Sequence, residues 1–160
     1  MMAFAVGDFV AHPLHGAGVI DHIETCCSGG VERDYYVMRI PKGDILVKIP
    51  KDSSDAIGVR PVIRSEQAQN LLDSIASIEI EVTQNWNRRY RENMLRIRSG
   101  NLMEVAAVIK SLSRREGSRG LSTGERKMLN SARQILLSEL VLAQHSTYDE
   151  VEAQLERALA

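Results

Sequence analysis

Residues 34–50 read DYYVMRIPKGDILVKIP, and this stretch decides the fold of the first third of the chain. Side chains along a strand point alternately to the two faces of a sheet, and the first half of the stretch alternates in this way. One face carries Tyr36, Met38 and Ile40, and the other carries Tyr35, Val37 and Arg39. In the second half, Ile45, Val47 and Ile49 form an apolar face that leaves Leu46 and Lys48 outward. Lys42-Gly43 provides a compact turn, so the stretch predicts a β-hairpin.

Similar short runs surround this hairpin. Five strands are expected, over residues 8–11, 18–24, 34–40, 45–49 and 59–62. Ser28-Gly29-Gly30 provides a looser turn before the third of them. Five short antiparallel strands in so few residues predict a small SH3-like or Tudor-like β barrel.

After Arg64 the apolar period changes from two to about 3.6, which is the period of a helix. Helices are expected over 65–75, from Thr83 or Asn85 to Gly100, over 102–115, from Ser122 to about 143 and over 149–159. Residues 76–82 could be extended or helical. Gly117 and Gly120 are expected to bracket a turn, and Ser122 and Glu125 are spaced as a capping box at a helix start. The predicted fold class is α+β, with a Tudor-like domain over 1–62 and an all-α helical domain over 63–160.

Composition and motifs exclude several classes of protein. The N-terminus has no basic segment before an apolar run, and no stretch is apolar enough to span a membrane, so a cytoplasmic protein without a membrane partner is expected. Cys26 and Cys27 are adjacent and are expected to stay reduced. Pro13 separates His12 from His15, which argues against a metal site. No phosphate-binding loop, catalytic triad or carboxylate pair is evident, so we expect no enzyme, no cofactor and no small-molecule substrate.

Charge is distributed unevenly along the chain. Residues 84–133 carry 12 basic and 4 acidic side chains, whereas residues 1–83 carry 7 basic and 12 acidic ones. Residues 134–160 are again acidic. The basic middle block is where a polyanion would bind, although a solvated helical face rich in arginine has the same composition.

The richest segment of this block is QNWNRRYRENM, residues 84–94. On a helical wheel Trp86, Tyr90, Met94 and Ile97 share one narrow sector, and arginines surround it. One interpretation is that Trp86, the only tryptophan, begins a stripe of core residues. The other is that Trp86 lies in the first helical turn and projects beyond the packed face, because Asn85 can cap the helix. An aromatic ring beside arginines suits binding to an unstacked base or a minor groove. The residues alone leave these interpretations about even.

Two pairs of segments carry a family resemblance. VGDFVAHPLHGAG at residues 6–18 and GDILVKIP at 43–50, then NWNRRY at 85–90 and RGLSTGERKML at 119–129, resemble the two modules of the CarD/CdnL family of bacterial RNA polymerase-binding transcription regulators. The resemblance covers nearly the whole chain in the same order.

This resemblance implies a Tudor-like domain that binds the β subunit of RNA polymerase and a helical domain that contacts promoter DNA. The DNA contact would fall at the upstream edge of the transcription bubble, where Trp86 would act as a wedge that slows collapse of the open promoter complex. The expected DNA-binding residues are Trp86, Arg88, Arg89, Arg91, Arg119, Arg126 and Lys127. The expected polymerase-binding residues are Lys48, Ile49, Pro50 and Cys26.

Cys26 departs from the pattern, because some relatives carry an arginine there that also contacts the polymerase. Loss of one charge at the rim of an interface costs about 0.5 to 1 kcal/mol, which weakens docking without abolishing it. An alternative hypothesis is a protein-binding adaptor with no direct DNA contact, in which the arginines form a solvated surface or one that binds an acidic partner.

Overall fold

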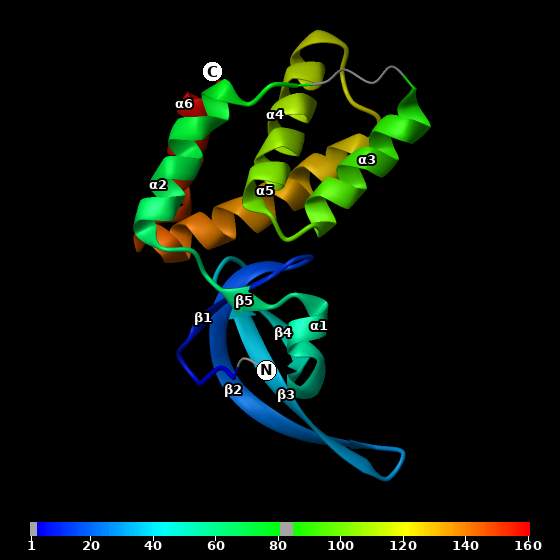
Figure 1. The fold of residues 1–160 in the computed structure, drawn as a ribbon, viewed down its shortest axis with the longest axis vertical. Coiled ribbons are helices and arrows are strands. Elements are labelled where there is room, and N and C mark those ends of the chain that lie inside the picture. The colour runs from blue at the N-terminus through cyan, green and yellow to red at the C-terminus, as the bar shows by residue number, and fades with distance from the viewer. Residues whose placement is uncertain (1–2, 81–84) are drawn as a thin grey trace.

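The computed structural model describes residues 3–80 and 85–160. Strands occupy the N-terminal part and helices the rest, as Figure 1 shows. The strands are β1 (Phe9–His12), β2 (Gly16–Ser28), β3 (Val31–Ile40), β4 (Ile45–Pro50) and β5 (Arg60–Pro61). They form one antiparallel sheet in the order β4-β3-β2-β1-β5, which leaves β4 at an edge. The predicted fold class, a five-stranded antiparallel β part followed by helices, is confirmed.

The hairpin of β2 and β3 is longer than predicted. Pairing continues to Ser28 opposite Val31, so Gly29 and Gly30 alone form the turn. Both glycines have positive φ, at 60° and 80°, which the tightest hairpin turns require. The looser turn predicted for this position is therefore wrong, and the extra pairs carry the hairpin away from the helices (Figure 1).

The sheet buries one face as the alternation predicts. Tyr36, Met38 and Ile49 are at most 1% exposed, in a cluster with Val10 and Ile20. One prediction about an individual side chain is wrong. Ile45, expected on the apolar face, is 53% exposed because it lies at the end of the edge strand β4. Val37, predicted on the face opposite Tyr36, is also buried, since β3 is an inner strand and the pairing residues His22 and Lys48 flank it.

The helices include the five that were predicted, in the predicted order, and one short helix, α1, that was not predicted. They are α1 (Ser54–Ile57), α2 (Ser65–Ser74), α3 (Trp86–Arg98), α4 (Leu102–Ser118), α5 (Thr123–Gln144) and α6 (Tyr148–Leu159), with short 3-10 turns η1 (Lys51–Ser53) and η2 (Ile75–Ser77). Gly117 lies within α4 rather than in the turn that was expected. The ambiguous segment 76–82 is a 3-10 turn up to Ser77. Its last two residues, and the alternative cap Thr83, lie outside the described residues.

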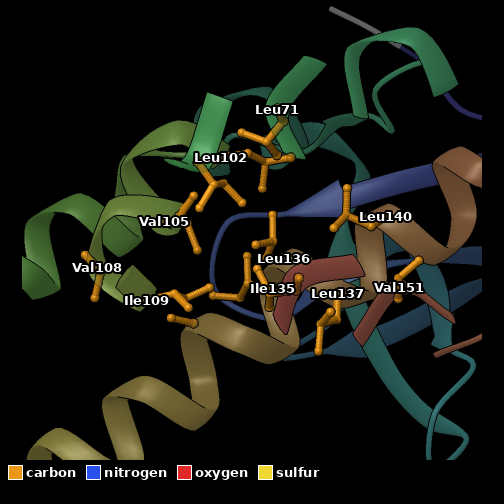
Figure 2. Packing of buried hydrophobic residues seen from close by; sticks show 14 of the residues in the cluster. Leu71, Leu102, Val105, Val108, Ile109, Ile135, Leu136, Leu137, Leu140 and Val151 are labelled. Carbon is orange, nitrogen blue, oxygen red and sulfur yellow. The ribbon is translucent and has the colours of Figure 1, made fainter. Parts of the chain in front are cut away.

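A single apolar core joins α2, α4, α5 and α6. Figure 2 shows Leu71 of α2 and Leu102 of α4 facing Leu136 of α5, with Val151 of α6 closing the far side. Helix α5 contributes most, because its residues from Ile135 to Ala143 are all buried. This half of α5 is buried on every side, and it lies between the sheet and the other helices (Figure 1).

Lys110 on α4 is a buried cation that closes one helix end. Its side chain is 2% exposed, and its ammonium donates to the carbonyl oxygens of Ile75, Ala76 and Ile78 at 2.8 to 3.0 Å. The last carbonyls of a helix have no partner within the helix. Lys110 therefore satisfies the carbonyls where α2 and η2 end and ties them to α4.

The sheet packs directly on α5. Gly16, at the start of β2, has φ 90°, and a Cβ atom there would lie 2.5 Å from Ser138 Oγ of α5. The neighbouring amide of Ala17 donates to the same oxygen at 2.8 Å. Only glycine permits this approach of backbone to helix.

Arg60 and Glu139 complete the contact between sheet and helices. Both Arg60 terminal nitrogens donate to the Glu139 carboxylate, at 2.6 and 2.9 Å, and the Ile63 amide donates to it at 2.9 Å. The Glu139 carboxylate is almost fully buried. Three charge-assisted bonds therefore compensate for its removal from water.

Removing the arginine from this pair should destabilise the protein strongly. Arg60→Met leaves the Glu139 carboxylate buried with one donor, and we expect a loss of about 3 kcal/mol in the free energy of unfolding. Urea denaturation provides the measurement. The matched control is Arg33→Met, which removes an exposed pair with Asp52 and should change stability little. Equal losses in the two variants would contradict the importance of burial at Glu139.

His12 should make stability depend on pH. Burial, and then the charge of His15, lower the pKa of His12 from 6.5 to about 4, and its Nδ1 accepts the Leu14 amide, which requires the unprotonated ring. Arg60 and Glu139 line the same small hollow. Because the folded-state pKa is lowered, His12 stabilises the fold fully above pH 6.5, and this stability is lost progressively as pH falls towards about 4. Melting temperatures from pH 8 to 4 should fall less steeply in His12→Asn than in wild type. Identical slopes would exclude His12 as the source.

Candidate nucleic-acid interface and edge-strand docking surface

Helix α3 begins at Trp86, and this start decides where the indole lies. The Asn85 side chain accepts the Arg88 amide at 3.0 Å, which confirms Asn85 as the N-cap. Trp86 is therefore in the first turn, where it is 43% exposed. Tyr90 and Met94 are half-buried, and Ile97 is buried in the core. The apolar sector predicted for α3 thus runs from solvent at Trp86 into the interior at Ile97.

Two neighbours hold the Trp86 ring. Tyr90 stacks against one face, with ring centroids 5.1 Å apart and planes 20° from parallel. The indole nitrogen donates to Ser122 Oγ, at the start of α5, at 3.2 Å. Trp86 is not a core residue, because these contacts leave much of the ring in contact with solvent.

Arg89, about one turn after Trp86 on α3, is buried against the start of α5. Its guanidinium donates to the Glu125 carboxylate, with Nε to Oε2 at 2.9 Å and Nη2 to Oε1 at 3.3 Å. Both side chains are less than a tenth exposed. Arg89 was predicted to contact DNA, but its charge is neutralised inside the bundle, so we assign it to holding α3 against α5 instead.

Glu125 has more than one role at this junction. Its amide donates to Ser122 Oγ at 3.2 Å, as the predicted capping box requires, but its carboxylate accepts from Arg89 and from the Ser122 hydroxyl rather than from the Ser122 amide. Burial on its own raises the pKa of Glu125, yet the Arg89 guanidinium, the Ser122 hydroxyl and the charge of Arg115 together hold that pKa below its usual value. The carboxylate therefore stays charged at neutral pH and keeps its partners in place.

The exposed cations fall into two groups. Arg88 is paired with Glu92 at 3.0 Å, and Arg126 with Glu116 at 3.4 Å. Among the other exposed cations of residues 84–133, five have no carboxylate within 4.0 Å in the part of the chain that the structure describes, namely Arg91, Arg98, Arg114, Arg119 and Lys127. Exposed pairs are weak and can be exchanged, but unpaired cations are free to meet phosphates at once.

Three of the unpaired cations border the aromatic residues. One open hollow is lined by Trp86, Tyr90 and Met94 together with Arg91 and Arg98. A second shares Tyr90, Met94 and Arg98 and adds Lys127 of α5. We call the surface formed by these residues the α3 surface. Of the predicted site residues, it brings together Trp86, Arg91 and Lys127, whereas Arg119 lies in the turn between α4 and α5.

Arg98 was not among the predicted site residues. It follows Arg91 by seven residues, and two turns of helix return a side chain to nearly the same face. This spacing was the signal in the sequence that could have placed Arg98 on the α3 surface.

The residues predicted to bind polymerase lie on β4, the edge strand, or close to it. Lys48 is exposed and pairs with Glu24 at 2.9 Å, while its ammonium lies 4.0 Å from Cys26 Sγ. The hydrogen bond to Glu24, and then the charge of Cys26, raise the pKa of Lys48. Pro50 is half-buried at the end of β4. Ile49 is 1% exposed, so its side chain belongs to the sheet core and is not part of a docking surface.

The outer edge of β4 has two further features. Within the described residues β4 pairs with β3 alone, so its other side has no strand partner. Ile45 and Leu46 are more than half exposed beside Lys48. We call β4 with these three side chains the β4 edge. Such an edge can accept a strand from another protein.

Together, the described residues form an unpaired edge strand in the sheet and a cationic, aromatic surface on the helices, two features typical of a binding protein. None of the described helices is long and apolar enough to cross a membrane.

Comparison with known proteins identifies the class more closely. Residues 4–63 match the family described as "CarD-like/TRCF RID domain", and residues 70–156 match "CarD, C-terminal domain". Over 150 residues the chain is 29% identical to "Putative transcription factor YdeB" of Bacillus subtilis (strain 168), an alignment that covers 94% of this chain and 98% of that protein. The chain belongs to the CarD-like family of RNA polymerase-interacting transcription factors, which are regulators and not enzymes.

Proposed function

We propose that the protein stabilises the open promoter complex by holding RNA polymerase and promoter DNA at the same time. Its domain over residues 1–62 binds the polymerase β subunit, and its domain over 63–160 binds DNA at the upstream edge of the transcription bubble. The observation that carries this proposal is the α3 surface, where the half-exposed ring of Trp86 lies among the unpaired cations Arg91, Arg98 and Lys127. With these partners, the protein acts in the cytoplasm at the nucleoid.

The β4 edge supports the polymerase contact. An unpaired edge strand offers a row of backbone donors and acceptors, which gives affinity without depending on side-chain identity. Leu46 and Lys48 point outward beside that row, and they supply an apolar and a charged contact. Ile49 contributes backbone groups only, because its side chain is buried.

The charges of the α3 surface support the DNA contact. Contacts from arginine or lysine to phosphate carry no base information, so binding should be largely independent of sequence. Trp86 adds an apolar plane that can lie against an unstacked base at the edge of the melted region. Stacking of this kind is worth about 1 to 3 kcal/mol, enough to shift a balanced opening equilibrium strongly.

Weak DNA contacts suffice because the polymerase holds the protein nearby. Tethering raises the local concentration of the second binding surface, so the two contacts together bind far more tightly than either alone. In this division of labour, the β4 edge locates the protein and the α3 surface acts on the DNA.

Replacing Trp86 should shorten the life of the open complex. Without the ring, Trp86→Ala loses stacking of about 1 to 3 kcal/mol, so we expect lifetimes to fall by a factor of about 5 to 160 towards the value without protein. Dissociation from a promoter after addition of a competitor provides the measurement. Leu95→Ala, which removes another exposed apolar side chain from α3, serves as control. Equal lifetimes for Trp86→Ala and wild type would rule out the wedge.

Substitutions in the two surfaces should separate the two contacts. Lys48→Glu should weaken binding to the polymerase β subunit about two- to fivefold and leave binding to free DNA unchanged.

Arg91→Ala should weaken binding to free DNA and leave binding to the polymerase β subunit unchanged. It should also reduce the slope of log affinity against log salt by about 0.9, the value for one phosphate contact. The control is Arg157→Ala, which removes an exposed arginine from the acidic helix α6. No DNA affinity at low salt in wild type would favour the protein-binding adaptor.

A further inference from the structure

We propose that Ser122 is a positioning residue for Trp86, which sets the indole at the angle in which it meets DNA. The inference rests on the proposed function, because it concerns how the wedge is held. The two residues are 36 positions apart and belong to different elements, Trp86 to α3 and Ser122 to the N-cap of α5. The hydrogen bond between them therefore fixes the ring relative to two helices at once.

The hydroxyl of Ser122 uses its full hydrogen-bonding capacity. It accepts from the Trp86 indole at 3.2 Å and from the Glu125 amide at 3.2 Å, and it donates to Glu125 Oε1 at 3.3 Å. A hydroxyl has one proton to donate and two lone pairs, so no further bond is available. Its orientation is thus determined on all three sides.

The network continues from Ser122 into the interior. Glu125 is 2% exposed, and Arg89 holds its carboxylate through two hydrogen bonds. Arg115 adds its charge, with Nε 3.9 Å from Glu125 Oε1. A buried ion pair with good geometry has little freedom to move. The hydrogen-bond network therefore runs from the buried Arg89 through Glu125 and Ser122 to the half-exposed ring of Trp86.

The geometry also decides which part of the indole meets DNA. Tyr90 covers one face, and Ser122 occupies the N–H, the only polar group of the ring. The opposite face remains for the ligand. Because the N–H is already used, Trp86 contacts a base by stacking and apolar contact alone, which every base can accept.

Ser122→Gly tests the proposal with little damage to α5. Glycine at an N-cap costs only a few tenths of a kcal/mol relative to serine, so the helix should persist, and a melting curve verifies this. We expect open-complex lifetime to fall about fivefold, the effect of losing one hydrogen bond. Ser122→Thr keeps a hydroxyl at the cap and should restore most of the lifetime. An unchanged lifetime in Ser122→Gly, with a shortened one in Trp86→Ala, would overturn the positioning role and leave the wedge intact.

A double-mutant cycle separates positioning from a general loss of structure. Trp86→Phe keeps an aromatic ring but has no N–H to donate. If Ser122 acts through this bond, Ser122→Gly should have almost no further effect on lifetime when Trp86→Phe is already present. Additive losses in the double variant would contradict the proposal.

Fluorescence anisotropy of the single tryptophan provides a measurement that does not depend on DNA or polymerase. Trp86 should depolarise faster in Ser122→Gly than in wild type or Ser122→Thr, because the ring has lost one of its two holding contacts. Identical depolarisation in all three proteins would overturn the proposal. This result also stands apart from the proposed function, since the wedge could fail on DNA while the ring is still held.

Discussion

The carboxylate of Glu139 is the group on which the arrangement of the molecule depends. It lies on α5, the central helix, and accepts two bonds from Arg60 and one from the amide of Ile63. A buried charge must be compensated, so residues 60–63, which connect the sheet to the helices, are held in one position against α5. Ser138, one residue before Glu139 on α5, contacts Gly16 and Ala17 and so holds the start of strand β2 against the same helix. The sheet and the bundle are therefore joined by specific polar bonds as well as by apolar packing.

The junction between sheet and helices sets the distance between the two candidate binding surfaces. The β4 edge and the α3 surface lie in different parts of the chain, and a flexible linker would allow many distances and angles between them. A fixed junction removes that freedom in advance, so less entropy is lost when both partners are bound together. The same rigidity limits where Trp86 can reach once the β4 edge is occupied. In the function that we propose, position along the promoter is then set by this geometry rather than by recognition of bases, which agrees with a surface suited to phosphate contacts and stacking.

The sequence predicts most of the fold because local patterns carry it. Periods of two and 3.6 locate the strands and helices, and Asn85 is a recognisable cap, so the margin position of Trp86 follows from local chemistry. What the sequence does not reveal depends on contacts between distant residues. Glu139 is 79 positions from Arg60, and nothing in either segment indicates the other. The side chain of Ile49 illustrates a second limit of prediction from the sequence. A resemblance in sequence marks β4 as a docking strand, but only the fold shows that this side chain points into the core.

The arginines of α3 show why charge composition alone is a poor guide to a nucleic-acid surface. Arg89 and Arg91 are two residues apart, which places them about 200° apart around the helix, so they cannot share an environment. Arg89 faces α5 and is neutralised by Glu125, whereas Arg91 faces the hollow beside Trp86 without an acidic partner among the described residues. The buried pair is nonetheless connected to the exposed surface, because Arg89 donates to Glu125, Glu125 accepts from Ser122, and Ser122 accepts from the indole. The two arginines therefore have different surroundings: Arg89 belongs to the buried network that reaches the indole, and Arg91 is exposed beside the ring.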